Sequence, residues 1–188
     1  MFSRLRIAID MDEVLADTLT AEITWFNAQW GYNLSKSMLA GRELADVVDA
    51  AAFEAHESLL SQGVFFRDIS VMPGSQGAVE MIASRHDVFV VSAATEYPSS
   101  CAYKFTWLRE HFTFIPPERI VFCGDKSILA AHVLIDDNCR HFSRFTGHGM
   151  LFLAPHNLEI KGWPRLRDWE EARATLLNPA FSVETLVP

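Results

Sequence analysis

The residues that could carry chemistry in this sequence are acidic, hydroxyl and lysine side chains that follow short apolar runs. They are Asp10 and Asp12, then Ser92, then Lys126, and finally Asp136 and Asp137. Several carboxylates in one place repel one another, and a hard, oxygen-seeking cation such as Mg²⁺ is the usual solution. A lysine and a hydroxyl are then left to bind a dianionic group. This combination is typical of an enzyme that moves a phosphoryl group.

Each of these residues also has a simpler interpretation when it is taken alone. One of the two N-terminal aspartates could cap the helix that follows, and Ser92 could be an ordinary loop hydroxyl. Lys126 could be a solvated lysine, and the pair Asp136–Asp137 could form a turn. The functional interpretation is favoured because all of them occur together, each at the end of a predicted strand.

The elements that must position these side chains alternate between strands and helices. Continuous apolar runs predict strands at residues 5–9, 87–91, 120–122, 131–135 and 150–153, and helical spacing predicts helices at residues 77–84 and 98–112. In a parallel sheet the carboxyl ends of the strands share one edge, so the polar groups are expected to meet in one crevice. We therefore predict an α/β fold with a Rossmann-like parallel sheet flanked by helices.

The stretch between the first two predicted strands is long and helical. Two sets of apolar residues recur there at helical spacing: Leu19, Ile23, Phe26 and Trp30, followed by Gly31, and then Val48, Ala52, Ala55 and Leu59, followed by Gly63. The next strand-like residues are Val64 to Phe66. Because roughly 50 residues exceed an ordinary crossover, we predict a small helical cap at residues 18–72, inserted after the first strand of a core formed by residues 1–17 and 73–188.

Length, charge and cysteine content limit the function further. The chain has 188 residues, enough for one core domain with a small insertion. Its net charge of -8 disfavours binding to long nucleic acids. No apolar stretch is long enough for a signal peptide or a bilayer span, and the three cysteines form no CxxC pair. We expect a cytoplasmic protein with no membrane partner.

The order of these motifs resembles the four motifs of the haloacid dehalogenase superfamily of phosphatases. More closely, five segments resemble the 5'(3')-deoxyribonucleotidase family, including its bacterial members. The segments are Asp10-Met11-Asp12-Glu13-Val14-Leu15-Ala16-Asp17, Gly63-Val64-Phe65-Phe66, Met72-Pro73-Gly74, Gly124-Asp125-Lys126 and Leu134-Ile135-Asp136-Asp137-Asn138. The resemblance extends from about Ile7 to Asn157 and is specific in the core and weak in the cap. It implies a haloacid dehalogenase-like fold and a Mg²⁺-dependent phosphomonoesterase acting on deoxyribonucleoside or ribonucleoside monophosphates.

The resemblance also implies a role for each site residue. Asp10 attacks phosphorus and carries an aspartyl-phosphate, while Asp12 donates a proton to the leaving oxygen and later takes one from water. Phosphate oxygens are held by Ser92, Lys126 and the backbone N–H groups of Met11 and Asp12. The implied metal ligands are Asp10, Asp12 through its main-chain carbonyl, and Asp137, with Asp136 beside it. The implied cap pocket is drawn from Thr18, Arg42, Glu43, Leu44, Phe65 and Phe66.

Two positions depart from the family pattern. Many relatives have Gly where Glu13 stands, and the vertebrate enzymes have Thr-Ser where this chain has Ser92-Ala93. Glu13 leaves the chemistry intact if its side chain points away from the crevice, whereas Ala93 removes one phosphate hydroxyl. These departures affect the choice of substrate more than the mechanism.

Two other functions stay open at this point. A phosphatase of the same superfamily could act on another small ester such as a sugar phosphate, because the cap determines the substrate. A non-enzymatic phospho-acceptor signalling domain also uses acidic residues, a hydroxyl and a lysine, but its acceptor Asp follows an internal strand, whereas Asp10 follows the first. The expected partner is therefore a small phosphate monoester, a nucleoside monophosphate by preference, and a homodimer is left open.

Overall fold

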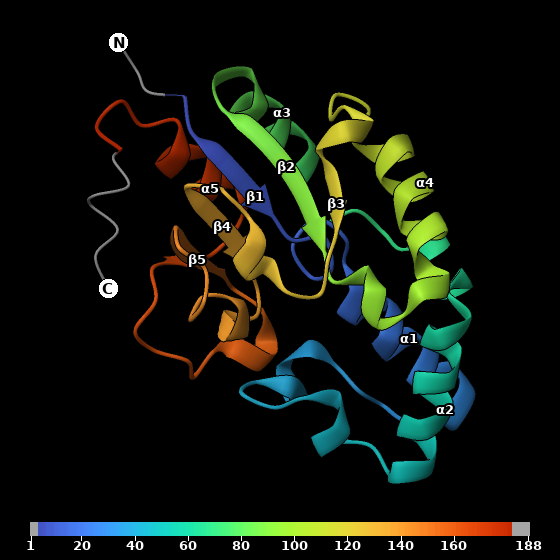
Figure 1. Cartoon of the computed structure of the whole chain (residues 1–188). Helices are drawn as coiled ribbons and strands as arrows, with labels where there is room; N and C mark the ends of the chain where they lie inside the picture. Colours follow the sequence, from blue (N-terminus) through green and yellow to red (C-terminus); the bar gives the residue numbers. More distant parts are fainter. Residues whose placement is uncertain (1–3, 182–188) are drawn as a thin grey trace.

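A six-stranded parallel sheet forms the centre of the protein in the computed structural model, which describes residues 4–181 (Figure 1). The strands are β1 (Arg6–Ile9), β2 (Asp87–Ser92), β3 (Ile120–Phe122), β4 (Val133–Asp136), β5 (His148–Phe152) and β6 (Arg165–Leu166), in the spatial order β3-β2-β1-β4-β5-β6. The two ends of the predicted core, residues 1–3 and 182–188, lie outside the described part. This strand order, with β1 near the middle, confirms the predicted Rossmann-like α/β fold.

The strands are joined by α-helices and by single turns of 3₁₀-helix. The α-helices are α1 (Thr18–Trp30), α2 (Ala50–Gln62), α3 (Ser75–Arg85), α4 (Cys101–His111) and α5 (Trp169–Leu176). The 3₁₀-helices are η1 (Lys36–Leu39), η2 (Leu44–Asp46), η3 (Val64–Arg67), η4 (Ala94–Glu96), η5 (Pro98–Ser100), η6 (Pro117–Arg119), η7 (Lys126–Ile128), η8 (Cys139–His141) and η9 (Pro155–Asn157). Across residues 4–181, every helix is too short or too polar to cross a membrane.

The register of the sheet brings the polar strand ends to one edge. Ile9 of β1 lies opposite both Val90 of β2 and Ile135 of β4. The next residue, Asp10, donates its backbone N–H to the carbonyl of Ile135 at 2.8 Å. Asp10 and Asp136 therefore sit side by side where their strands end.

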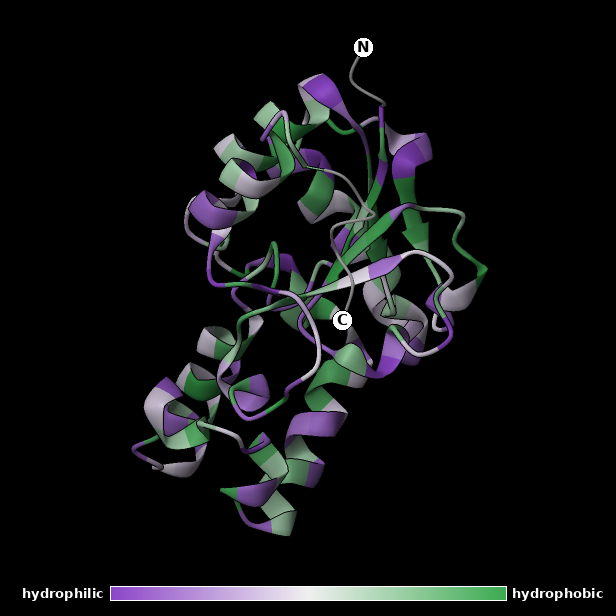
Figure 2. Ribbon diagram, turned by 90° about the vertical axis from the view of Figure 1, so that its left-hand side faces the viewer, coloured by the Kyte–Doolittle hydropathy of each residue, from purple (hydrophilic) through white to green (hydrophobic). Residues whose placement is uncertain are grey.

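Apolar side chains cover both faces of the sheet, and much of the strand ribbon is green, the hydrophobic colour, in Figure 2. On one face Ile7, Ile9, Val88, Val90, Val133 and Ile135 pack with Val79 and Ile82 of α3, Trp107 and Leu108 of α4, and Ala172 and Leu176 of α5. On the other face Ala8, Val91, Leu134 and Leu151 pack with Phe142 and Phe145 beside η8. The three core helices thus lie on one face, and loops with short 3₁₀ turns cover the other.

Residues 18–72, hereafter the cap segment, contain α1, η1, η2, α2 and η3, and α1 and α2 lie below the sheet in Figure 1. A separate small core is formed there by Leu19, Ile23, Phe26, Leu34, Leu39 and Ala52. As predicted, α1 begins after Asp17, whose side chain accepts the N–H of Thr20, and ends before Gly31. The second predicted helix likewise ends before Gly63, whose φ of 79° suits glycine.

The buried face of α2 differs from the prediction. Ala52, His56 and Leu60 are buried, whereas the expected Ala55 and Leu59 are half-exposed. The helix is turned so that the imidazole of His56, a polar group, lies inside among aromatic rings. Apolar periodicity could not predict this because a histidine does not count as an apolar residue.

Three further predictions in the chain need correction. The strand-like residues Val64 to Phe66 form the 3₁₀-helix η3, because the left-handed Gly63 before them starts a tight turn. Trp30 is 42% exposed at the end of α1, beyond the apolar face that it was expected to extend. The sequence interpretation contained neither β6 nor α5, since β6 has two residues and gives no periodic signal.

Candidate active site

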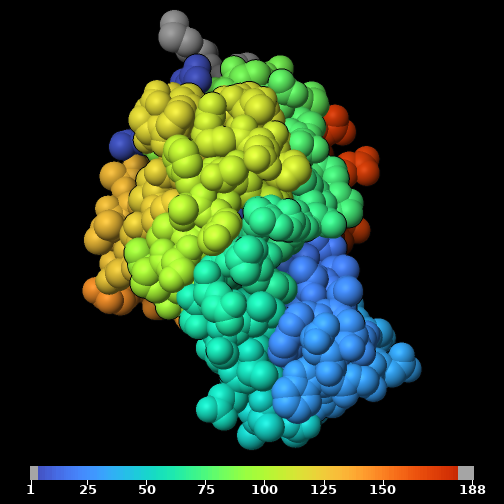
Figure 3. Space-filling model, turned by 90° about the vertical axis from the view of Figure 1, so that its right-hand side faces the viewer, coloured from blue at the N-terminus to red at the C-terminus, as the bar shows by residue number. Residues whose placement is uncertain are grey.

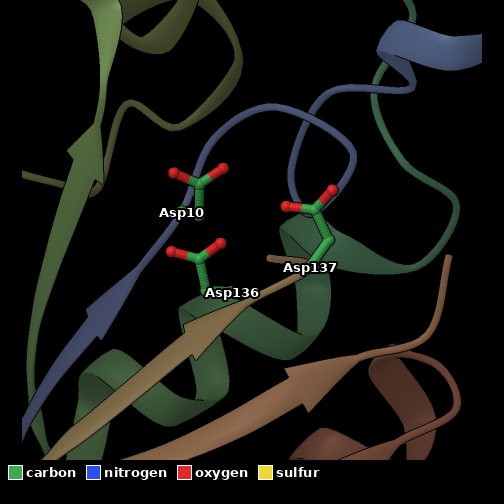
Figure 4. Close-up of side chains that lie close together, drawn as sticks. All are labelled: Asp10, Asp136 and Asp137. Carbon is green, nitrogen blue, oxygen red and sulfur yellow. The ribbon is translucent and has the colours of Figure 1, made fainter. Parts of the chain in front are cut away.

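Three carboxylates converge at the edge of the sheet where β1 and β4 end (Figure 4). Asp10 follows β1, Asp136 is the last residue of β4, and Asp137 comes next in the chain. One oxygen from each carboxylate lies within 4.8 Å of the others. Asp10 and Asp136 are buried and Asp137 is half-buried. Carboxylate oxygens at this spacing form the kind of ligand set that a hard divalent cation takes.

The ammonium of Lys126 lies between two of these carboxylates. Its Nζ donates to Oδ2 of Asp136 at 2.7 Å and also to Oδ1 of Asp10. The Lys126 side chain is 1% exposed. Burial alone would lower the pKa of Lys126, but the two neighbouring carboxylates raise it well above its usual range. Lys126 therefore stays charged inside the protein.

One buried ammonium does not balance three buried or half-buried carboxylates. Burial raises the pKa of Asp10 to about 7, although Lys126 opposes this rise. Burial, and then the charge of Asp136, raise the pKa of Asp137 well above its usual range. A bound divalent cation would supply the missing positive charge and keep these groups ionised. The charge and the spacing of the three carboxylates thus fit such a cation.

Asp12 lies in the turn after β1 and has partners of its own. Its Oδ2 accepts from Nζ of Lys104 at 2.5 Å and from Oγ of Ser92 at 3.4 Å. Its Oδ1 accepts from Oγ1 of Thr18, also at 3.4 Å. The Asp12 side chain is 31% exposed, so it is open to solvent in a way that Asp10 is not. This carboxylate is held in place while it remains accessible.

Lys104 is a site residue that the sequence interpretation missed. It lies on α4 and is buried, and its ammonium is 4.1 Å from the centroid of the Phe66 ring, a cation–π contact. A signal for it existed: Lys104 precedes Trp107 and Leu108 by three and four residues, which places it on the buried face of that helix. A lysine on a buried face requires an anionic partner, and Asp12 is that partner.

The remaining predicted phosphate-binding residues are placed as follows. Ser92 ends β2 and is fully buried, with its hydroxyl directed to Asp12. The side chain of Met11 is buried in the main core, and its carbonyl accepts the N–H groups of Leu15 and Ala16 at 2.8 Å. The roles of Ser92 and of the Met11 backbone N–H toward a phosphate stay predictions.

A cavity of about 500 Å³ lies between the carboxylates and the cap segment. It is lined on the core side by Asp10, Asp12, Ala93, Lys104, Asp136 and Asp137, and on the cap side by Thr18, Glu22, Leu39, Arg42, Glu43, Leu44, Phe53, His56, Glu57, Leu60 and Phe66. Its volume is in the range of small-molecule sites. In Figure 3 the teal part of the cap segment adjoins the yellow-green part of the core, where η3 packs against α4 and α2 against η5.

Most of the residues predicted for the cap pocket line this cavity. They are Thr18, Arg42, Glu43, Leu44 and Phe66. Phe65 is not among the described lining residues, and its ring packs edge-on against Phe66 with 5.4 Å between centroids. The sequence interpretation missed Glu22, His56 and Glu57, because on an amphipathic helix such residues look like members of a solvated face.

Glu13 takes an unusual position. Its φ is 55°, a left-handed conformation that favours glycine. Its Oε2 accepts the N–H of Leu19 at 2.8 Å, and its Oε1 lies 3.4 Å from Nζ of Lys36. Burial raises the pKa of Glu13. The side chain thus caps the first turn of α1 while it also forms part of the cavity wall.

Comparison with known proteins gives a consistent result. The family described as "5' nucleotidase, deoxy (Pyrimidine), cytosolic type C protein" matches residues 4–180. A Bacillus subtilis protein named 5'(3')-deoxyribonucleotidase is 34% identical over 171 residues, which cover 91% of this chain and 98% of that one. A Staphylococcus epidermidis relative, to which the same name is given provisionally, is 37% identical over 175 residues, 91% of this chain and 95% of that one.

Solved structures show the same fold at lower sequence identity. A HAD-hydrolase from Bacillus subtilis, bound to magnesium, has a TM-score of 0.59 at 16% identity and covers 93% of this chain and 99% of that one. A HAD family hydrolase from Deinococcus radiodurans, with bound phosphate and sodium, has a TM-score of 0.60 at 15% identity and covers 98% of both chains. The chain therefore belongs to the 5'(3')-deoxyribonucleotidase family and has the haloacid dehalogenase-like fold, as its sequence motifs predicted.

Proposed function

We propose that the protein is a Mg²⁺-dependent phosphomonoesterase that dephosphorylates deoxyribonucleoside and ribonucleoside monophosphates through an aspartyl-phosphate. The observation that carries the proposal is the convergence of Asp10, Asp136 and Asp137 around buried Lys126. The name of the Bacillus subtilis relative supports the substrate class. The magnesium in the related HAD-hydrolase supports the choice of metal.

In this proposal Asp10, Asp136, Asp137 and the main-chain carbonyl of Asp12 hold Mg²⁺, which would neutralise charge on the phosphoryl oxygens. Lys126 binds a phosphoryl oxygen with its charged ammonium, which its burial between two carboxylates fixes in position. The hydroxyl of Ser92 and the backbone N–H groups that follow Asp10 provide further donors.

Asp10 and Asp12 divide the chemistry between them. A carboxylate oxygen of Asp10 forms a bond to phosphorus while the bond from phosphorus to the ester oxygen breaks, and Asp12 donates a proton to that oxygen. Water then attacks the same phosphorus and gives its proton to Asp12. The bond to Asp10 breaks, and inorganic phosphate and the free Asp10 carboxylate result. The contacts of Asp12 with Lys104, Ser92 and Thr18 support its role, because they hold it still beside the nucleophile.

We also propose that residues 18–72 act as a cap that selects the substrate. The cavity reaches from the carboxylates to this segment, so a substrate with its phosphate at Asp10 would place its other end against the cap. Closure of such a cap would exclude water from the phosphoryl group. Location in the cytoplasm stays a prediction.

The test is phosphate release from a panel of deoxyribonucleoside, ribonucleoside and sugar monophosphates, measured with Mg²⁺ and again after exhaustive treatment with EDTA. We expect turnover of nucleotides in Mg²⁺ and none after chelation, with activity restored when Mg²⁺ is added back. Full turnover after chelation would contradict the metal assignment. A preference for sugar phosphates over every nucleotide would contradict the nucleotidase assignment and leave the phosphatase mechanism intact.

A further inference from the structure

We infer that Glu22 and His56, at the cap end of the cavity, bind the polar edge of the nucleobase; the inference rests on the function proposed above. Glu22 belongs to α1 and His56 to α2, and both line the cavity that also contains the three carboxylates. Neither residue contacts the carboxylate cluster or Lys126 in the described structure. They form a second polar group in the same cavity, on its cap side.

The position of Glu22 on α1 indicates how far it lies from Asp12, where the phosphoryl group is proposed to bind. Thr18, at the start of the helix, touches Asp12 through its hydroxyl at 3.4 Å. Glu22 follows Thr18 by four residues, so it lies on the same face of the helix and roughly 6 Å further along the axis. A ligand that reaches both ends must therefore be longer than a phosphate and carry a second polar part.

His56 supplies the observation that points to a ligand. The residue is 2% exposed, and neither Nδ1 nor Nε2 has a hydrogen-bond partner among the described residues. The Nε2 atom lies 3.4 Å from Oε1 of Glu22, without the geometry of a hydrogen bond. Buried polar atoms without partners are rare in folded proteins. A polar ligand group seated against both Glu22 and His56 would give each side chain a partner.

The protonation states of these two groups favour an uncharged, polar ligand. Burial lowers the pKa of His56 to about 4, so the imidazole is neutral and offers one donor and one acceptor. Burial, followed by the charges of Glu13 and Asp12, raises the pKa of Glu22 to about 8, so its carboxyl carries a proton at neutral pH. A protonated carboxyl presents an adjacent donor and acceptor. The imide edge of uracil or thymine presents the complementary acceptor and donor.

Aromatic rings around His56 favour a flat ligand over a sugar. The ring centroid of His56 lies 4.9 Å from that of Phe26, 5.5 Å from that of Trp25 and 6.3 Å from that of Phe53. Phe53 also lines the cavity, as does Phe66 on the side toward Lys104. A planar base can stack on such rings while its edge reaches Glu22 and His56.

The experiment measures kcat/KM in Mg²⁺ for the unmodified enzyme and for Glu22→Met, Glu22→Gln and His56→Phe. The two substrates are deoxyuridine monophosphate and deoxyribose 5-phosphate. The second has the same sugar phosphate and no base. We expect Glu22→Met and His56→Phe to lower kcat/KM for the nucleotide about 10-fold and to leave the sugar phosphate within about twofold. Glu22→Gln keeps a donor and an acceptor, so it should stay within about threefold of the unmodified enzyme on both substrates.

A second measurement, the affinity for deoxyuridine, does not depend on turnover. Glu22→Met should weaken binding of this nucleoside about 10-fold, and Glu22→Gln should leave it nearly unchanged. Equal losses on both phosphate esters, or unchanged nucleoside affinity in Glu22→Met, would overturn the inference while the unmodified enzyme still hydrolysed nucleotides. Failure of the unmodified enzyme to hydrolyse any nucleotide would instead overturn the proposed function, and the inference with it.

Discussion

Replacement of Glu22 by Gln is expected to stabilise the protein, by an amount that grows with pH. In the unfolded chain Glu22 titrates near 4.5, whereas burial raises its pKa in the folded protein to about 8. Between these two values the folded protein holds a proton that the unfolded chain has released. The free energy of unfolding of the wild type therefore falls as the pH rises through this window. Gln does not titrate, so the variant escapes this loss.

The size of the effect follows from the same two values. A difference between 4.5 and about 8 corresponds to about 5 kcal/mol for a group fully removed from water. The Glu22 side chain is 16% exposed, and water reduces the effect, so we expect a relative gain of about 2 kcal/mol between pH 5 and pH 8. The groups that face Glu22 and act on it are Glu13, Asp12, Glu57, Glu43 and His56. These groups are present in both the wild type and Glu22→Gln. The difference between the free energies of unfolding of the two proteins at each pH therefore reports on Glu22.

The assay is urea unfolding of the wild type and of Glu22→Gln at several pH values between 5 and 8. Glu54, an exposed glutamate of α2, provides a matched control, and Glu54→Gln should leave the free energy of unfolding unchanged at every pH. A difference between Glu22→Gln and the wild type that does not vary with pH would refute the reasoning. So would a variant that is less stable than the wild type at pH 8.

Three other predictions test the site. Lys126→Met should lower kcat/KM roughly 100-fold for nucleotide and sugar phosphates alike, because every substrate loses the same charged contact, and a loss confined to nucleotides in the phosphate-release assay would contradict this. Lys104→Met should lower kcat/KM for esters with alkyl leaving groups about 10-fold more than kcat/KM for p-nitrophenyl phosphate, because Asp12, the proposed proton donor to the leaving oxygen, loses its partner at 2.5 Å. Lys104→Arg should restore part of this difference. Replacing Arg42 and Leu44 by Ala should change the ranking of nucleotides and leave p-nitrophenyl phosphate within about twofold; an unchanged ranking would argue against the cap pocket.

The core of the fold was predictable because its strands are buried on both faces. Residues 7–9 at the end of β1 are all apolar, and so are residues 88–91 of β2 and 133–135 of β4. Once a parallel sheet is inferred, Asp10 and Asp136 are expected at the same edge, because the carboxyl ends of parallel strands share it. The sheet and the carboxylates at its edge were therefore accessible from one sequence.

The cap end of the site was not predictable in the same way. His56 replaces an apolar residue at the buried position of α2, so the periodicity suggested a face turned by one residue. Glu22 looks like a solvated glutamate until α2 is placed against α1. Lys104 gave a usable signal, but its partner Asp12 is 92 residues away in the chain. Contacts between side chains on separate elements depend on how those elements pack, and local sequence patterns do not contain that information.

The central claim is that phosphate passes through Asp10, and the most direct measurement is acid quenching of the enzyme during turnover of a nucleotide, followed by mass spectrometry of the peptide that contains this residue. We predict a phosphoryl group on Asp10 in the wild type and none in Asp10→Asn, whose circular dichroism should be unchanged while its turnover falls about 10³-fold or more. A phosphoryl group on a different residue, or wild-type turnover by a correctly folded Asp10→Asn, would contradict the account.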